Sequence, residues 1–259
     1  MVIRDALLIV LLLASSASAQ GVVLSMRQTR GDQAATTVMQ LDSTHVRADL
    51  GRGSNGAVVV FDGTAQVLRM IDSERKSYRE VTRAQTAQVG ALLAAVQAQL
   101  EKFPPEQRKA MEAMLRGRAG MLAGGPALAP ISYARTGQSK VGAWGCVLYD
   151  GLRDGQKVVE ICAADGAEFG LTAADFQGVR QLVEFVKVLV PLAADEIAVY
   201  GSLEEQGFAG FPVRRTTLVN GMPDTVTELV DLRRESIPAS AFEVPAAFTR
   251  EELFPNMRR

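Results

Sequence analysis

The sequence has very few histidines and cysteines, which many metal sites and catalytic sites use. Its 259 residues include one histidine, His45, and two cysteines, Cys146 and Cys162, and no C-x-x-C motif occurs. The common histidine and cysteine metal sites need more ligands than these, so we predict no metal site. The 28 basic and 29 acidic residues nearly cancel, so the composition gives no indication of the strongly basic surface typical of nucleic-acid-binding proteins. We therefore expect no nucleic-acid partner.

Familiar catalytic motifs are also absent or out of context. A Ser-His-Asp triad would have to use His45, which lies in an alternating strand pattern, and no G-x-S-x-G motif is present. Residues 73–76 match S-x-x-K, but they lie between two predicted strands and lack the partner motifs of that enzyme class. Paired acidic residues such as Asp72 and Glu74 lie in charged turns, where solvation explains them. We predict no catalytic residue and keep a hydrolase as an alternative.

A glycine-rich segment, residues 51–56, matches the G-x-G-x-x-G motif of dinucleotide-binding proteins. In those proteins the glycines follow a strand and open a helix, whose N-terminus receives the pyrophosphate. Here the next residues, 57–61, are apolar and mostly β-branched, which predicts a strand. We interpret the glycines as part of a turn and predict no cofactor.

The N-terminal segment has the three parts of a secretory signal peptide. A charged start with Arg4 precedes an apolar run over residues 6–14, and small residues follow. The run is shorter than the ~20 residues that span a membrane, which disfavours the alternative of a retained membrane anchor. We expect cleavage between Ala19 and Gln20. Because no cysteine lies at this position, lipid attachment is not expected, and the mature protein should be soluble and periplasmic.

Export bears on the two cysteines, which lie in AWGCVLYDGLRDGQKVVEICAAD, residues 143–165. This segment has the pattern of a β-hairpin with a turn at Asp154-Gly155. If the loop has three residues centred on Asp154, positions whose numbers add up to about 308 face each other, and Cys146 lies opposite Cys162. In an oxidising compartment this arrangement predicts a disulfide, with two buried free thiols as the alternative. An error of one residue in the loop would place the cysteines on opposite faces.

Strand and helix patterns alternate along the first half of the chain. Short alternating segments separated by Gly, Asn and Asp turns predict an antiparallel meander. Its strands are expected at residues 22–29, 35–41, 45–50, 57–61, 66–71 and 77–81. A helical period then begins with the capping pair Thr82 and Gln85 and predicts a helical insertion over residues 82–130. Whether residues 104–130 within it form a mobile flap stays open.

The second half returns to strands around one more helix. Residues 131–135 predict a strand that leads into the cysteine hairpin. A long helix follows over residues 173–190, capped by Thr172, with an apolar stripe that would bury one face against the sheet. Residues 207–219 and 225–234 predict a long hairpin, whose second arm alternates charged and aliphatic side chains as in a sheet with one wetted face.

Three stretches of the sequence resemble a family of exported bacterial proteins that is classed as a domain of unknown function. The first stretch is residues 58–81, in which three strands are separated by an Asp-Gly turn and an acidic turn. The second is the cysteine hairpin, and the third is residues 210–248. The last stretch ends in FEVPAAF, residues 242–248, which is similar to the family's F-x-x-P-x-x-aromatic close. The domain of this family is related to the outer-membrane lipoprotein carriers of the LolA/LolB type.

The resemblance implies an α+β fold, mainly antiparallel β. In it, about eleven strands form a half-open barrel of the LolA type and helices cover its concave face. It also implies a single domain over residues 20–259, with the helical insertion at residues 82–130. In the carriers the concave face binds acyl chains. None of their binding residues matches a position in this chain, so no ligand-binding residue is assigned.

Two functions are consistent with these expectations. The first is a periplasmic, non-catalytic carrier that holds an apolar ligand, such as a lipid or acyl chain, between the sheet and the helices. The alternative is an envelope protein-interaction or stress-sensing module without a small ligand, whose partner would be another envelope protein. With either function, no transmembrane segment is expected in the mature chain.

Overall fold

The computed structural model of the chain describes residues 18–51, 56–104, 106–108, 130–187, 200 and 207–253. The strands within these residues are β1 Ser18–Arg30, β2 Gln33–Leu41, β3 His45–Asp49, β4 Ala57–Asp62, β5 Val67–Asp72, β6 Ser77–Thr82, β7 Ser132–Val141, β8 Trp144–Arg153, β9 Gln156–Ala164, β10 Phe211–Val219, β11 Met222–Pro238 and β12 Thr249–Glu251. The helices are α1 Arg83–Leu100 and α3 Gln177–Val186, with short 3-10 helices η3 Gly166–Phe169, η4 Ala173–Phe176 and η5 Ala239–Phe242.

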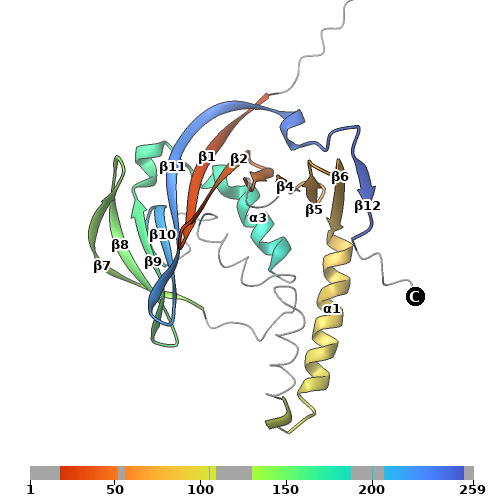
Figure 1. Cartoon of the computed structure of the whole chain (residues 1–259), viewed down its shortest axis with the longest axis horizontal. Helices are drawn as coiled ribbons and strands as arrows, with labels where there is room; N and C mark the ends of the chain where they lie inside the picture. Colours follow the sequence, from red (N-terminus) through yellow and green to blue (C-terminus); the bar gives the residue numbers. More distant parts are fainter. Residues whose placement is uncertain are drawn as a thin grey trace, which may run out of the picture.

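The described strands form one sheet of twelve, in the order β12-β6-β5-β4-β3-β2-β1-β11-β10-β9-β8-β7. All neighbouring pairs are antiparallel except β12 with β6, which is parallel. Figure 1 shows the sheet curved like an arch, with α3 beneath it and α1 descending from the end of β6. Because the strands at the two ends of the order do not pair, the barrel is half open. The predicted fold class is confirmed, with twelve strands in place of about eleven.

The pairing of β1 with β11 joins two antiparallel meanders into this single sheet. β11 has 17 residues and β1 has 13, and their pairing runs from Ser18 opposite Pro238 to Arg30 opposite Thr225. Strands β2 to β6 follow on one side of this pair, and β10 to β7 follow on the other. One irregularity interrupts the pairing, where Val230 has no partner between Leu229 and Asp231.

The inner face of the sheet carries the main hydrophobic core. Side chains alternate between the two faces of each strand, so every second residue of β3 to β6 points inward. Phe61 of β4 packs against Phe185 of α3, with ring centroids 5.3 Å apart, and both side chains are fully buried. Val179 and Leu182 of α3 lie in the same core. The apolar stripe predicted for this helix therefore faces the sheet, as expected.

The outer face carries a second, smaller apolar cluster beneath the C-terminal part of the chain. Val58 and Val60 of β4 and Ile71 of β5 pack there with Ile237 and Phe242. Val60 and Ile237 are exposed to 0% and 1%, respectively. The segment from the end of β11 through η5 is thus held on the outer face by burial of its own apolar side chains.

The two helical segments begin at the predicted caps. Gln85 accepts a hydrogen bond from the backbone N–H of Thr82 at 2.9 Å and so caps α1. The second helix begins with η4, where Asp175 accepts from the backbone N–H of Thr172 at 2.7 Å, and continues as α3. Residues 188–190 of the predicted helix, and most of the insertion beyond residue 108, lie outside the described residues.

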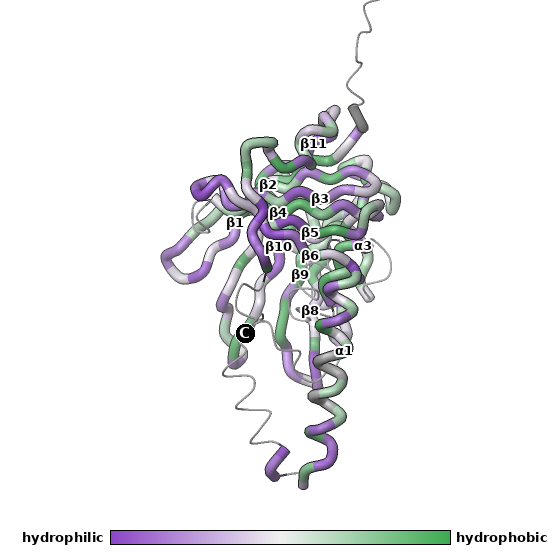
Figure 2. Tube along the Cα trace, turned by 90° about the vertical axis from the view of Figure 1, so that its right-hand side faces the viewer, coloured by the Kyte–Doolittle hydropathy of each residue, from purple (hydrophilic) through white to green (hydrophobic). Residues whose placement is uncertain are grey.

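In Figure 2, α1 extends away from the stacked strands β3 to β6, and only its first part lies beside them. The first turn of the insertion, at the start of α1, directly follows the end of β6. The flap considered for residues 104–130 lies almost wholly outside the described residues. None of the helices in the described part of the chain is long and apolar enough to cross a membrane.

The cysteine hairpin is present, but its loop is shorter than predicted. Arg153 lies opposite Gln156, so the loop contains only Asp154 and Gly155. These two residues have φ values of 51° and 76°, as in the type I′ turns that fit the twist of paired strands. The three-residue loop that we predicted from the Asp-Gly signal is therefore wrong.

A bulge between Gly151 and Leu152 shifts the register by one further residue. As a result Leu148, and not Cys146, lies opposite Cys162. The two shifts add up to two positions, which keeps both cysteines on the same face of the hairpin. Cys146 and Cys162 form a disulfide with their Cα atoms 5.4 Å apart, although the predicted direct opposition is wrong.

Residues 1–17 lie outside the described residues, so the signal peptide expected over residues 1–19 stays a prediction. The expected cleavage point lies within β1, where Ala19 is opposite Ile237 and Gln20 is opposite Ser236. Cleavage there would leave most of β1 in the mature chain.

Replacement of Cys146 by alanine should lower the free energy of unfolding by about 3 kcal/mol in oxidising buffer, because the bond closes a loop between residues 16 positions apart. Urea unfolding of the variant and of the wild-type protein, each with and without reductant, measures the effect. The difference should nearly vanish in reductant. Two alkylatable thiols in the exported wild-type protein would contradict the prediction.

Candidate functional site

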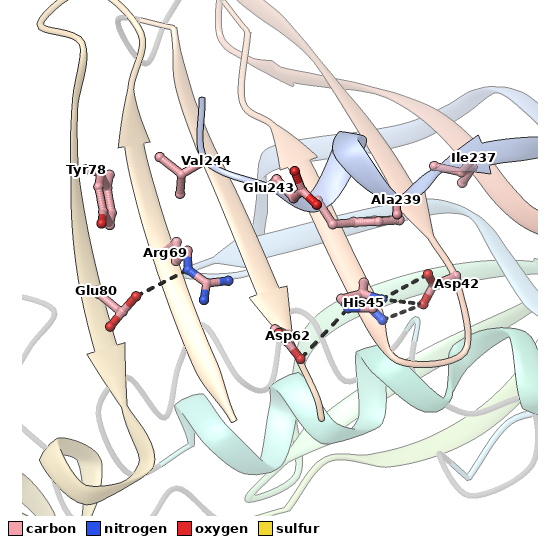
Figure 3. A pocket seen from close by; sticks show the side chains of 11 residues that line it. Asp42, His45, Asp62, Arg69, Tyr78, Glu80, Ile237, Ala239, Glu243 and Val244 are labelled. Carbon is pink, nitrogen blue, oxygen red and sulfur yellow. Dashed lines mark hydrogen bonds and ion pairs between the residues drawn. The ribbon is translucent and has the colours of Figure 1, made fainter. Parts of the chain in front are cut away.

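A pocket of about 680 Å³ lies on the outer face of the sheet, opposite α3. Figure 3 shows it between strands β3 to β6 and the segment that runs from the end of β11 through η5. Its lining residues are Asp42, His45, Asp62, Arg69, Tyr78, Glu80, Ile237, Ala239, Phe242, Glu243 and Val244. A pocket of this size is typical of sites that bind a small molecule or a few side chains of a peptide.

Strand pairing brings the polar lining residues together. His45 of β3 lies opposite Asp62 of β4, and Arg69 of β5 lies opposite Glu80 of β6. Directly opposed residues in an antiparallel pair point to the same face of the sheet. The two pairs therefore project into the same pocket, beside Tyr78, which lies two residues before Glu80 on β6.

Asp42 fixes the turn between β2 and β3 together with the ring of His45. Its Oδ1 accepts hydrogen bonds from the backbone N–H of Thr44 at 2.7 Å and of His45 at 2.6 Å. Nδ1 of His45 lies 3.0 Å from Oδ2 of Asp42. Burial raises the pKa of Asp42, but the hydrogen bonds from Thr44 and His45 outweigh it, so the pKa lies below the ordinary carboxyl value.

The ring of His45 is held between carboxylates and an aromatic side chain. Its Nε2 lies 3.8 Å from Oδ1 of Asp62. The ring stacks on Phe242 with centroids 4.9 Å apart and an angle of 22° between the planes. Because Phe242 is buried, this stack anchors η5 over β3 and closes one side of the pocket. The prediction that His45 lies in a strand is confirmed, since it is the first residue of β3.

Helix α3 supports the same turn from the inner side of the sheet. A Cβ atom at Gly178 would lie 3.2 Å from the carbonyl oxygen of His45 and 3.3 Å from that of Asp42. A side chain at this position would be in tight contact with the turn, so glycine allows the close approach of helix and turn without a shift of either. The turn that holds His45 is thus packed between α3 on one side and the pocket on the other.

At the other end of the pocket, Glu80 is shared by two arginines. Its Oε2 lies 3.3 Å from Nε of Arg69, and its Oε1 lies 3.0 Å from Nη2 of Arg250. Arg250 belongs to β12, whose parallel pairing with β6 places Thr249 opposite Ser77. The charge of Glu80 is therefore balanced within the protein.

Two polar groups of the pocket have no hydrogen-bond or ion-pair partner within the described part of the chain, the hydroxyl of Tyr78 and the carboxylate of Glu243. Four lining residues are acidic, whereas Arg69 and the single histidine are the basic ones. The apolar part of the wall comes from Ile237, Phe242 and Val244. The arrangement therefore suits a ligand that combines a positively charged group with an apolar part.

The remaining motifs from the sequence do not contribute to this pocket. Residues 73–76 form an exposed turn between β5 and β6, as predicted. Of the G-x-G-x-x-G segment, residues 52–55 lie outside the described residues. Within the described ranges, no group of three or more His, Cys, Asp and Glu side chains is placed to hold a metal ion.

Sequence reasoning missed the pocket because its lining comes from segments far apart in the chain. One local signal was available. In the Asp-Ser-Thr-His sequence at residues 42–45, an aspartate that bonds the backbone two and three residues later is typical of a tight turn. Nothing local to His45 indicated that Phe242, almost 200 residues later, would stack on it.

A family model described as a domain of unknown function, DUF4412, matches residues 99–248. This match covers more than half of the chain, and the chain belongs to that family. The recognition of such a family from the strand pattern and the FEVPAAF close is confirmed. No curated protein matches the sequence.

The chain also matches several solved structures at low sequence identity. An uncharacterized conserved protein from Thermus thermophilus is 7% identical, with 92% of each chain covered and a TM-score of 0.47. In the MucA/MucB complex of Pseudomonas aeruginosa, the matched chain is 12% identical, with 89% of this chain and 57% of that chain covered and a TM-score of 0.34. A LolA superfamily protein from Nitrosomonas europaea is 8% identical, with 88% and 90% covered and a TM-score of 0.27. At these scores no residue's role transfers to this chain.

Replacement of Asp42 by asparagine should destabilise the protein by about 1 kcal/mol at pH 7, because charge-assisted hydrogen bonds to the turn become neutral ones. The folded-state pKa of Asp42 is lowered, so its contribution to stability is present above the unfolded-state pKa, about 4, and is lost as the pH falls through the folded-state value. The difference in urea midpoint between variant and wild type should therefore shrink at pH 3.

The exposed Asp32, in the turn between β1 and β2, provides the control, because its replacement by asparagine removes the same charge away from the pocket. If both substitutions lowered the stability equally at pH 7, or if the difference between Asp42→Asn and wild type grew at low pH, the stabilising role of the Asp42 carboxylate would be contradicted.

Proposed function

We propose that this member of the DUF4412 family is an exported binding protein of the cell envelope, which acts by holding a ligand and not by catalysis. The observation that carries the proposal is the outer-face pocket, whose walls combine carboxylates with apolar side chains. The ligand that fits these walls best is a basic, partly apolar segment of another envelope protein. The disulfide supports an oxidising location such as the periplasm.

The chemistry of the lining supports binding over reaction. The carboxylate of Asp42 accepts hydrogen bonds from the backbone of its own turn, and that of Glu80 forms ion pairs with two arginines. Both carboxylates therefore orient neighbouring groups. Asp62 and Glu243 line the same pocket. The carboxylate of Asp62 accepts hydrogen bonds from the backbone N–H groups of Thr64 and Ala65. A lysine or arginine side chain between Asp62 and Glu243 would gain attraction from both carboxylates.

A carrier for a lipid or acyl chain on the concave face is the second candidate. Its support is the apolar inner face of the sheet, together with the contacts of the helices. α3 contacts β3 and β4, whereas α1 contacts the sheet at β6. An apolar chain could lie on the inner face beside α3, where strand side chains and helix side chains already meet.

A peptide titration tests the first candidate. A peptide of alternating lysine and leucine should bind by calorimetry, and a peptide of alternating glutamate and leucine should not. Combined replacement of Asp62 by asparagine and Glu243 by glutamine should weaken binding about tenfold, because two attractive charges are removed. Asparagine at position 62 keeps the oxygen that accepts from the backbone of the turn.

The matched control removes two exposed acidic residues outside the pocket, Asp32→Asn with Glu74→Gln. This control should bind the lysine peptide like the wild-type protein. If both double variants weaken binding equally, the peptide responds to net charge and not to the pocket.

Mass spectrometry of an organic extract tests the second candidate. The protein purified from its native periplasm should release a stoichiometric apolar molecule if the concave face carries one, and a denatured sample processed in parallel serves as the control. An extract without such a molecule would count against the carrier and leave the peptide-binding proposal untouched.

A further inference from the structure

A second pocket, of about 460 Å³, lies between the tip of the β7–β8 hairpin and the strands β1, β10 and β11. The hairpin turns at Gly142-Ala143, with Val141 opposite Trp144. Its tip approaches strands that are not its neighbours in the sheet, so the pocket forms where the curved sheet folds back on itself. It shares no lining residue with the pocket around His45.

The charge of the second pocket is opposite to that of the first. Arg27, Lys140 and Arg214 line it, and Glu228 is its acidic residue. Arg27 of β1 and Arg214 of β10 lie directly opposite Glu228 of β11, one on each side. Within the described part of the chain, Arg27, Lys140 and Glu228 have no hydrogen-bond or ion-pair partner, and the nearest carboxylate to Arg214 is Glu160 at 4.0 Å. One carboxylate cannot balance three cations, so the pocket is positively charged.

The rest of the lining is apolar. Val141 and Leu229 are buried, with exposures of 7% and 5%. Trp144, the single tryptophan of the chain, is half-buried and packs against Phe169 with ring centroids 5.8 Å apart. Val230 is the residue without a partner in the β1–β11 pairing and is 47% exposed at the edge of the pocket. A bulge of this kind re-aims a side chain out of the regular pattern of the strand.

We propose that this pocket binds an amphipathic anion, in which a phosphate or carboxylate group contacts Arg27, Lys140 and Arg214 and an alkyl chain lies on Trp144 and Val230. The cations supply charge-assisted hydrogen bonds to the anionic group. The aromatic ring and the exposed valine remove the alkyl chain from water. The site is independent of the peptide-binding pocket, and either proposal stands if the other fails.

Because Trp144 is the only tryptophan, its fluorescence reports on this pocket directly. Octyl phosphate carries both parts of the ligand, inorganic phosphate carries the charge alone, and octanol carries the chain alone. Octyl phosphate should give a saturable change in Trp144 emission, with an apparent affinity about tenfold or more above that of either single-part probe. Added salt should weaken its binding, because the pocket is partly open to solvent. Equal binding of octanol and octyl phosphate would overturn the proposal.

The combined substitution Arg27→Ala with Lys140→Ala should weaken octyl phosphate binding about tenfold or more, because two ionic contacts are lost. The matched control, Arg83→Ala with Lys102→Ala, removes the same charge from exposed positions outside the pocket and should bind like the wild type. Circular dichroism checks that both fold. If the first double variant does not fold, Lys140→Gln alone and the three-probe comparison on the wild-type protein still decide the question. Unchanged binding by a folded pocket variant would overturn the proposal.

A sedimentation assay identifies the source of the anion. The protein should co-sediment with phosphatidylglycerol vesicles if the pocket binds the headgroup of a lipid in a membrane. Binding of octyl phosphate without sedimentation would instead indicate a soluble amphiphile. Neutral phosphatidylcholine vesicles should leave the protein in solution in both cases, and equal sedimentation with neutral vesicles would contradict a site for an anion.

Discussion

The pairing of β1 with β11 is the interaction on which the rest of the structure depends. Each flanking meander is built from contacts between neighbours in sequence, whereas β1 and β11 lie about two hundred residues apart. Their long ladder of backbone hydrogen bonds turns two local sheets into one curved sheet with an inner and an outer face. Closing so distant a contact costs chain entropy, which a ladder of this length and the burial of Val22, Val23 and Leu24 offset.

Much of the fold was predictable from the sequence because the signals are local. The alternation of apolar and polar residues located the strands from residue 22 to 81, and the Thr82–Gln85 and Thr172–Asp175 caps located the starts of both helical segments. Loop geometry was harder to predict. The Asp154-Gly155 signal indicated a hairpin but did not distinguish a two-residue from a three-residue loop. The bulge at Gly151 has no signature in the strand pattern, since it arises from packing between strands.

The two pockets could not be predicted for a related reason. The stacking of His45 on Phe242 and the approach of the β7–β8 hairpin to Arg27 join segments whose proximity depends on the curvature of the whole sheet. Each residue taken alone has an ordinary explanation, such as a turn aspartate, a strand histidine or a surface arginine. Only the assembled fold shows that the acidic residues gather around one pocket and three cations around another. The family resemblance correctly indicated the fold but assigned no residue to either site.

β11 contributes to both pockets, through Glu228, Leu229 and Val230 near its middle and Ile237 near its C-terminal end. At about 3.3 Å per residue, these positions are roughly 25 Å apart along a single hydrogen-bonded strand. Their spacing is therefore fixed by the number of residues between them more than by the identity of those residues. Inserting or deleting one residue between positions 230 and 237 would turn Ile237 to the opposite face relative to residues 228–230, whereas substitutions at exposed positions there would not. Among homologous chains, the length of this segment should thus vary less than its composition.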